Sequence, residues 1–277
     1  MSWHAVVAAL DDGDTFRSRV SVYLHPLAGR PIIWHVVSML AESQPAPADV
    51  CVLHHASAAM QLPDSLPVPV RAQAVTDGSE LVALRAAVTS PGLKLLVDGA
   101  APLVARPTVV RMLRAAESSV VALTEGTLES AYLAVSGEGP ALASADDPRH
   151  PAGAVPVAAT FRDELIRVTN RHTLAAASSA LHDRIIRAHE ANGVSFVLPS
   201  TVWVDAEVRI GADTVIYPGA VLEGHTEIGS ECVIGPYSRI VNASIGRGVE
   251  LKGWNYITQT TIRNQAVLEP YVRRGFD

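Results

Sequence analysis

Acidic side chains follow two of the apolar runs in this sequence, at points where strands are expected to end. Asp11, Asp12 and Asp14 come directly after the first run, and Asp98 follows a later one. Carboxylates grouped in this way repel one another and any anionic ligand unless a cation bridges them, and carboxylate oxygens are common ligands of divalent metals. Two interpretations stay open: a metal-binding loop and a set of solvated acidic side chains.

Familiar catalytic patterns are absent from the sequence. It contains neither Gly-x-Ser-x-Gly nor His-Glu-x-x-His, which serve a serine nucleophile and a zinc hydrolase. His54 and His55 end an apolar run without a ligand pattern around them, so the sequence gives little support to a metal site there. Cys51 and Cys232 lie far apart in apolar surroundings, and we expect two buried free thiols in a reducing compartment.

Composition limits the class of protein. The chain has 277 residues, 48% of them hydrophobic, which excludes general disorder and suggests two domains. A net charge of −6 without a basic run argues against binding to nucleic acid or to an anionic membrane. No cationic leader precedes the first apolar run, and no apolar stretch reaches about 18 residues, so we expect a cytoplasmic protein without a membrane span.

Strand and helix patterns alternate over the first part of the chain. This order predicts a mainly parallel sheet flanked by helices, and ligands bind such sheets beyond the carboxyl ends of the strands. The loops 11–22, 75–79 and 98–102 would then line the site. The expected strands are 4–10, 50–53, 68–74, 93–97 and 119–123, and the expected helices are 31–41, 79–88 and 106–116.

A longer helical pattern covers residues 171–191 and stops at Asn192-Gly193. At about 1.5 Å per residue it would form a connecting arm of roughly 30 Å. The remainder of the chain, from about residue 202, repeats every six residues. The repeat predicts a parallel β-helix of triangular coils, in which an aliphatic side chain points inward on each flat side and a small residue fits the corner before it.

The aliphatic positions are unbroken over seven hexads and then slip twice by one residue. They are Val204, Ile210, Ile216, Leu222, Ile228, Ile234 and Ile240, followed by Ile245, Leu251, Ile257 and Ile262. The small residues two positions earlier are Thr214, Ala220, Thr226, Cys232, Ser238 and Ala243.

Four segments carry a more specific likeness. Residues 214–224 (Thr-Val-Ile-Tyr-Pro-Gly-Ala-Val-Leu-Glu-Gly) and 232–239 (Cys-Val-Ile-Gly-Pro-Tyr-Ser-Arg) resemble the first coils of the bacterial bifunctional enzyme of UDP-N-acetylglucosamine synthesis. That enzyme joins an N-acetylglucosamine-1-phosphate uridyltransferase to a glucosamine-1-phosphate acetyltransferase. Residues 24–31 (Leu-His-Pro-Leu-Ala-Gly-Arg-Pro) resemble the stretch after its catalytic loop, and residues 168–174 (Val-Thr-Asn-Arg-His-Thr-Leu) resemble the start of its linker helix.

The likeness follows the family's order over nearly the whole chain, and it implies an architecture. We expect a Rossmann-like α/β nucleotidyltransferase domain over 1–168, a linker helix over 169–200 and a short left-handed parallel β-helix over 201–277. The family's β-helix packs as a trimer, so the resemblance also implies a homotrimer. Alternation along each short side would turn some apolar neighbours of the aliphatic ladder outward, from the set Val202, Val208, Val215, Tyr217 and Val221.

The family's phosphate-binding residues are not matched. Aligned without gaps from Leu24, the family's catalytic Arg falls on Thr15 and its Lys on Val22, while its second loop glycine falls on Gly13. Nucleotidyl transfer places negative charge on the phosphates, and Arg, Lys and Mg²⁺ stabilise that charge. Arg17 and Arg19 stand close enough in sequence to substitute in part, or they are solvated loop arginines.

The family's metal site is also altered. Its magnesium-binding Asp aligns with Ala100, so Asp98 and Asn170 are the remaining metal candidates, and each has a simpler role as a solvated strand-end residue or a helix cap. A Mg²⁺ cofactor is therefore only one of the open alternatives. The residues that contact uracil in the family align with Gln73, Gly78 and Ser79, which keep matching types, so that loop could hold a nucleotide or nucleotide sugar.

The acetyl-transfer region of the family begins near Leu268–Gly275 and extends past Asp277, where this sequence stops, so we expect no acetyl-CoA cofactor. Three hypotheses of function remain. The first is a relative with impaired or no catalysis that binds a nucleotide or nucleotide sugar. The second is a working sugar-1-phosphate nucleotidyltransferase with relocated phosphate and metal ligands. The third is a structural or regulatory partner of the authentic enzyme.

Overall fold

The computed structural model describes residues 2–10, 16–56, 67–89, 92–116, 121–124, 133–136, 147–149 and 154–275. The chain divides into two compact units, Met1–Ala177 and Ser178–Asp277. The division falls inside the helix α5 (Arg171–Ala191), which matches the predicted arm of 171–191. Each unit has its own core and is considered by itself.

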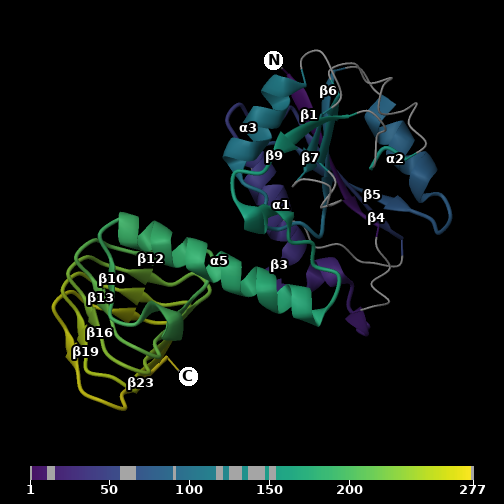
Figure 1. Cartoon of the computed structure of the whole chain (residues 1–277). Coiled ribbons are helices and arrows are strands. Elements are labelled where there is room, and N and C mark those ends of the chain that lie inside the picture. Colours follow the sequence, from purple (N-terminus) through teal and green to yellow (C-terminus); the bar gives the residue numbers. More distant parts are fainter. Residues whose placement is uncertain are drawn as a thin grey trace. The chain divides into compact units, whose positions relative to one another are not determined.

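Parallel strands form the centre of the first unit (Figure 1). β1 (Trp3–Ala9) lies between β4 (Val50–His55) and β6 (Leu93–Asp98), and β5 (Val70–Val75) pairs with β4 on the far side. All of these pairs are parallel. The side chains of β6 are buried along its whole length, which is typical of a strand covered on both faces.

The other half of the sheet is mixed. β8 (Leu133–Ser136) runs antiparallel to β6 and to β7 (Val121–Thr124), whereas β7 pairs in parallel with β9 (Val155–Ala158). The seven strands follow the order β5-β4-β1-β6-β8-β7-β9. The predicted mainly parallel α/β sheet is therefore confirmed for its first half, and the antiparallel β8 and the parallel β9 are additions that the sequence pattern did not reveal.

Within the part of the chain that the structure describes, three helices accompany this sheet, close to the predicted positions. They are α1 (Ile32–Ala41), α2 (Glu80–Thr89) and α3 (Arg106–Ala115). α1 buries nearly all of its residues, which explains its almost continuous apolar sequence. One core cluster joins α2 to the sheet. It consists of Leu84 and Val88 from α2 and of apolar side chains from β1, β4, β5 and β6, namely Val6, Ala8, Cys51, Leu53, Val75 and Leu96.

The second unit is a parallel β-helix, as the repeat predicts. Short strands in successive coils pair in parallel and build three sheets (Figure 1). The first holds β10 (Ser195–Phe196), β13 (Val215–Ile216), β16 (Val233–Ile234), β19 (Glu250–Leu251) and β22 (Val267–Leu268). The second holds β11 (Trp203–Val204), β14 (Val221–Glu223), β17 (Arg239–Val241), β20 (Tyr256–Thr258) and β23 (Arg273–Arg274). The third holds β12 (Arg209–Ile210), β15 (Glu227–Ile228), β18 (Ser244–Ile245) and β21 (Thr261–Ile262).

The aliphatic ladder fills the interior of these coils. Every predicted ladder residue from Val204 to Ile262 is buried, and so are the six small residues that precede ladder positions from Thr214 to Ala243. The coils approach too closely for larger groups at some turns, because a Cβ added at Gly235 would lie 2.3 Å from the carbonyl oxygen of Leu251. The six-residue repeat thus arises because neighbouring coils pack in direct contact with one another.

Two of the residues considered for an outward role face inward. Val202 and Val208 are buried in the core, because each stands two positions before a ladder residue and so occupies the corner position that Thr214 and Ala220 fill elsewhere. Val215 and Val221 are half-buried, and Tyr217 is exposed. The outward apolar surface is therefore smaller than the sequence suggested.

Aromatic side chains form a stack along one corner of the β-helix. Tyr237, Trp254 and Tyr271 each precede a strand of the second sheet, and each has a positive φ. The Tyr237 and Trp254 ring centroids are 5.8 Å apart, and those of Trp254 and Tyr271 are 5.7 Å apart, with nearly parallel planes. All three rings are largely exposed.

Within the described ranges, no helix combines the length and apolar character needed to cross a membrane. Cys51 and Cys232 are both buried and free, as predicted. Cys51 lies in β4, and burial raises the pKa of its thiol.

Candidate functional site

The carboxyl edge of the parallel strands places Asp98 at the centre of the first unit. Asp98 is the last residue of β6 and is completely buried. The backbone turns sharply after it, because Gly99 N donates to Ala8 O at 2.9 Å and Ala100 N donates to Asp98 Oδ1 at 2.8 Å. A Cβ at Gly99 would lie 3.1 Å from Ala8 O, so glycine allows this close approach of β6 to β1.

The Asp98 carboxylate is paired with an arginine from a distant segment. Arg167 Nε donates to Asp98 Oδ2, and the guanidinium is about one-third exposed while the carboxylate is inaccessible. The next residue fixes this segment against the loop after β6, since Val168 N donates to Ala100 O at 2.8 Å. The fold therefore delivers a positive charge to the strand-end carboxylate from the protein itself.

Asn170, the second metal candidate, caps α5. Its Oδ1 accepts from Thr173 N at 3.0 Å, and its own N–H donates to Thr173 Oγ1 at 3.1 Å. Such a reciprocal pair satisfies N–H groups that the first helical turn leaves open. Both metal candidates thus have protein partners, and the metal role of each stays a prediction.

Two positions that the resemblance assigns to catalytic groups face the interior. Val22 starts a 3₁₀ turn (η2, Val22–Leu24) with only 1% of its surface exposed, and Ala100 is completely buried. A lysine side chain at position 22 or an aspartate at position 100 would therefore be buried. The neighbouring candidates Gly13 and Thr15, like the acidic Asp11, Asp12 and Asp14, lie outside the described residues.

The two loop arginines are exposed, but the segment around them is anchored. Arg17 has a positive φ of 51°, and neither its side chain nor that of Arg19 is buried. Phe16 is buried against His25, with ring centroids 4.2 Å apart, and Arg171 lies over the Phe16 ring at 5.3 Å. Burial and the nearby Arg171 charge lower the pKa of His25, so this imidazole favours the neutral form.

The segment expected to read a nucleobase is open to solvent. Gln73 lies exposed on β5, the edge strand of the sheet. Gly78 has a φ of 81°, and its N–H donates to Glu80 Oε1 at 2.9 Å, while Ser79 Oγ donates to Thr76 O at 2.6 Å. These interactions shape the β5–α2 turn, and they leave its outer face accessible.

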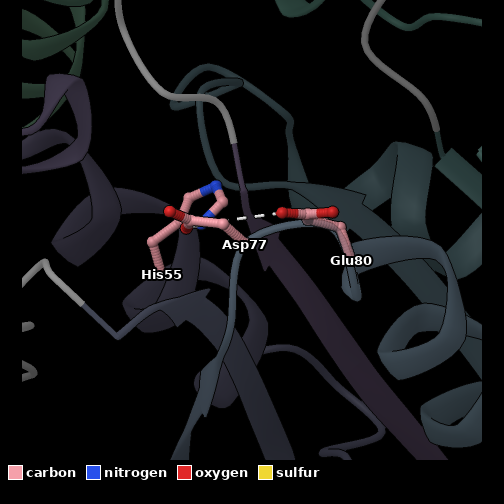
Figure 2. A group of neighbouring side chains, drawn as sticks. All are labelled: His55, Asp77 and Glu80. Carbon is pink, nitrogen blue, oxygen red and sulfur yellow. Dashed lines mark hydrogen bonds and ion pairs between the residues drawn. The ribbon is translucent and has the colours of Figure 1, made fainter.

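Sequence reasoning missed two interactions at this edge of the sheet. The first is Arg167, which directly precedes the segment 168–174 but pairs with a residue 69 positions earlier. The second is a group of three side chains, His55, Asp77 and Glu80, whose polar atoms lie within 4.8 Å of one another (Figure 2). Recognising that β4 and β5 are neighbours would have brought His55 and Asp77 together, because His55 pairs with Val75 in the sheet register.

Comparison with known proteins bears first on the repeat. Residues 207–242 match the bacterial transferase hexapeptide family of six repeats. The C-terminal part is also similar to bifunctional GlmU proteins, which confirms the likeness to the bifunctional enzymes inferred from the repeat motifs.

Two of these relatives illustrate the extent of the likeness. Identity to the bifunctional protein GlmU of Caldanaerobacter subterraneus subsp. tengcongensis is 39% over 109 residues, covering 39% of this chain and 24% of that protein. For the bifunctional protein GlmU of Geobacillus thermodenitrificans, it is 47% over 90 residues, covering 32% of this chain and 20% of that protein. The matched part spans a quarter or less of these relatives' length.

A solved structure supports the α/β fold of the first unit. A putative glucose-1-phosphate thymidylyltransferase from Bacillus anthracis in complex with sucrose aligns with a TM-score of 0.50 and 9% identity, over 65% of this chain and 95% of that chain. The predicted fold class, an α/β domain followed by a parallel β-helix of hexapeptide repeats, is confirmed by the strand order of the two units and by the family match.

Proposed function

We propose that this chain binds a nucleotide or nucleotide sugar at the carboxyl edge of its parallel strands and transfers nucleotidyl groups slowly or not at all. The ion pair between Asp98 and Arg167 carries the proposal. In the resembling family a carboxylate at this loop holds Mg²⁺, which neutralises the charge of the reacting phosphates. Here the strand-end carboxylate has the guanidinium of Arg167 as its counter-charge.

Two further observations support impaired transfer. A metal ion at Asp98 would have to displace the guanidinium of Arg167, which already neutralises this buried carboxylate. The positions that align with the family's Lys and metal-binding Asp hold the buried Val22 and Ala100. An active enzyme with relocated ligands would need a different set of cations, for which Arg17 and Arg19 are the exposed candidates.

Binding should be measurable even where transfer is not. We expect UTP or UDP-N-acetylglucosamine to bind with a micromolar to millimolar dissociation constant in isothermal titration calorimetry. Because Gln73 is exposed beside the β5–α2 turn, Gln73→Ala should weaken binding several-fold, since a lost hydrogen bond is worth about 1 kcal/mol. Gln259→Ala, in the repeat unit, serves as the control. No heat change with either ligand at millimolar concentration would favour the structural-partner hypothesis.

The β-helix is proposed to assemble as a homotrimer. Apolar side chains remain exposed on the second unit after the aliphatic ladder is buried, among them Val197, Leu198, Tyr217, Tyr237, Trp254, Val267 and Tyr271. Exposed apolar groups of this size favour an interface, and closed rotational symmetry would cover them on every copy.

Light scattering on the full chain is expected to give three times the mass of 29.3 kDa. The fragment 195–277 should give the same stoichiometry, because the proposed interface lies in the repeat. A monomeric mass of the full chain at tens of micromolar would exclude the trimer.

A further inference from the structure

Three side chains from neighbouring elements of the first unit converge beyond the carboxyl ends of β4 and β5 (Figure 2). His55 ends β4, Asp77 lies in the turn after β5, and Glu80 is the first residue of α2. His55 Nδ1 is 3.2 Å from Asp77 Oδ1 and 3.9 Å from Glu80 Oε1. None of the three is an alignment position of the catalytic loop or metal site discussed above.

The protonation of His55 is constrained by its second ring nitrogen. Nε2 lies 2.9 Å from Leu10 O, and a carbonyl oxygen can only accept, so Nε2 carries a hydrogen. In a neutral ring the lone pair then sits on Nδ1 and points toward the carboxylates. That contact is repulsive unless Nδ1 also carries a proton or a cation lies between the groups. An imidazole whose N–H donates to a backbone carbonyl is also the usual orientation of a metal-binding histidine.

We propose that His55, Asp77 and Glu80 bind a divalent transition-metal ion. At metal–ligand distances of about 2.1 Å, neighbouring ligand atoms of a tetrahedral or octahedral site lie about 3.0–3.4 Å apart. The His55–Asp77 separation of 3.2 Å fits this range, while the His55–Glu80 separation of 3.9 Å and the carboxylate pair, within 4.8 Å, would close by rotation of the side chains. Two carboxylates balance the charge of the ion, and three protein ligands leave room for water or an anionic ligand.

The ligand set also indicates which ions fit. Imidazole nitrogen with carboxylate oxygen suits Zn²⁺, Co²⁺ or Mn²⁺, whereas Mg²⁺ and Ca²⁺ prefer oxygen alone. Glu80 is held in place, because Gly78 N donates to its Oε1 at 2.9 Å. Backbone N–H groups of Glu80 itself and of Gly78 lower the pKa of this carboxyl, which keeps it ionised as a ligand must be.

The proposal is tested by titrating tag-free, chelator-treated full-length protein with Zn²⁺ against a chromogenic chelator. We expect one tight Zn²⁺ per chain, with affinity at least tenfold weaker in His55→Ala and in Asp77→Asn/Glu80→Gln. His225→Ala is the matched control, since His225 lies in the other unit, where its Nδ1 is 3.7 Å from Glu207 Oε1, and the Zn²⁺ affinity of this variant should not change. Co²⁺ substitution should add a visible absorption band that His55→Ala removes.

A second measurement guards against variants that fail to fold. In the wild-type chain, Zn²⁺ should slow hydrogen exchange of peptides that cover residues 75–82, and Mg²⁺ at the same concentration should not. The absence of Zn²⁺ binding up to 1 mM would overturn the proposal. Unchanged Zn²⁺ affinity in a folded His55→Ala variant would overturn it as well.

Discussion

Incubated with UTP, N-acetylglucosamine-1-phosphate and Mg²⁺, the purified chain is expected to release pyrophosphate at least about 10⁴-fold more slowly than an active bifunctional GlmU protein. Removing one preorganised charge stabiliser costs about 10²-fold or more in rate, and two such positions hold buried apolar side chains here, Val22 and Ala100. The measurement is a coupled pyrophosphate assay with both proteins at equal concentration. Both assays should contain saturating substrates.

The variant Asp98→Asn is the control, because it distinguishes a chain that has lost nucleotidyl transfer from one that performs it with different phosphate and metal ligands. If pyrophosphate appears at the rate of the active enzyme and Asp98→Asn abolishes it, then Asp98 serves as a metal ligand and the second hypothesis is correct. If the slow rate is unchanged in Asp98→Asn, the ion pair with Arg167 has no part in turnover. If nucleotidyl transfer is lost, as proposed, the slow rate should be the same in the wild-type chain and in Asp98→Asn.

The variant Arg167→Met is expected to destabilise the first unit by about 3 kcal/mol. It removes the guanidinium from a carboxylate that is completely buried, and a charge left in such a place costs about 3–5 kcal/mol. The lower end applies, because the Arg167 side chain is 36% exposed and water can take part of its place. Native-state hydrogen exchange of peptides from β6 measures the change in the free energy of opening.

Two further variants serve as controls for Arg167→Met. Asp98→Asn/Arg167→Met should recover most of the loss, because an amide at position 98 can still accept from Ala100 N without a buried charge. Arg106→Met breaks the exposed ion pair between Arg106 and Glu42 in the same unit and should cost under about 1 kcal/mol. Equal losses in Arg106→Met and Arg167→Met would show that burial of the Asp98 pair does not matter.

The repeat could be predicted from the sequence almost residue by residue. Ladder residues of successive coils pair in register and share one buried core, so one period of six determines strand, turn and core together. The inward position of Val202 and Val208 follows from the same rule, but the small-residue pattern at later corners hid it. In the β-helix, the spacing of residues along the sequence therefore also predicts which residues pack together.

The candidate site depends on contacts between distant segments, which spacing does not encode. Five strands of the sheet followed from apolar runs, whereas the four-residue strands β8 and β9 did not, because such short segments lack a clear pattern and their direction is set only by pairing. Arg167 meets Asp98 across 69 residues, and His55 meets Asp77 across 22. Neither contact can be predicted without knowing which segments are neighbours in the fold. Only the contact between His55 and Asp77 could have been inferred, by assuming that β4 and β5 are adjacent.

The aromatic stack on the β-helix gives the molecule an optical reporter of its own. Trp254 lies between Tyr237 and Tyr271 with ring centroids under 6 Å apart on both sides, and each ring belongs to a different coil. Electronic transitions of rings this close couple, so the near-ultraviolet circular dichroism of the chain carries a signal that depends on the distance between coils. Loosening of the coil stack would change that signal before the strands themselves are lost.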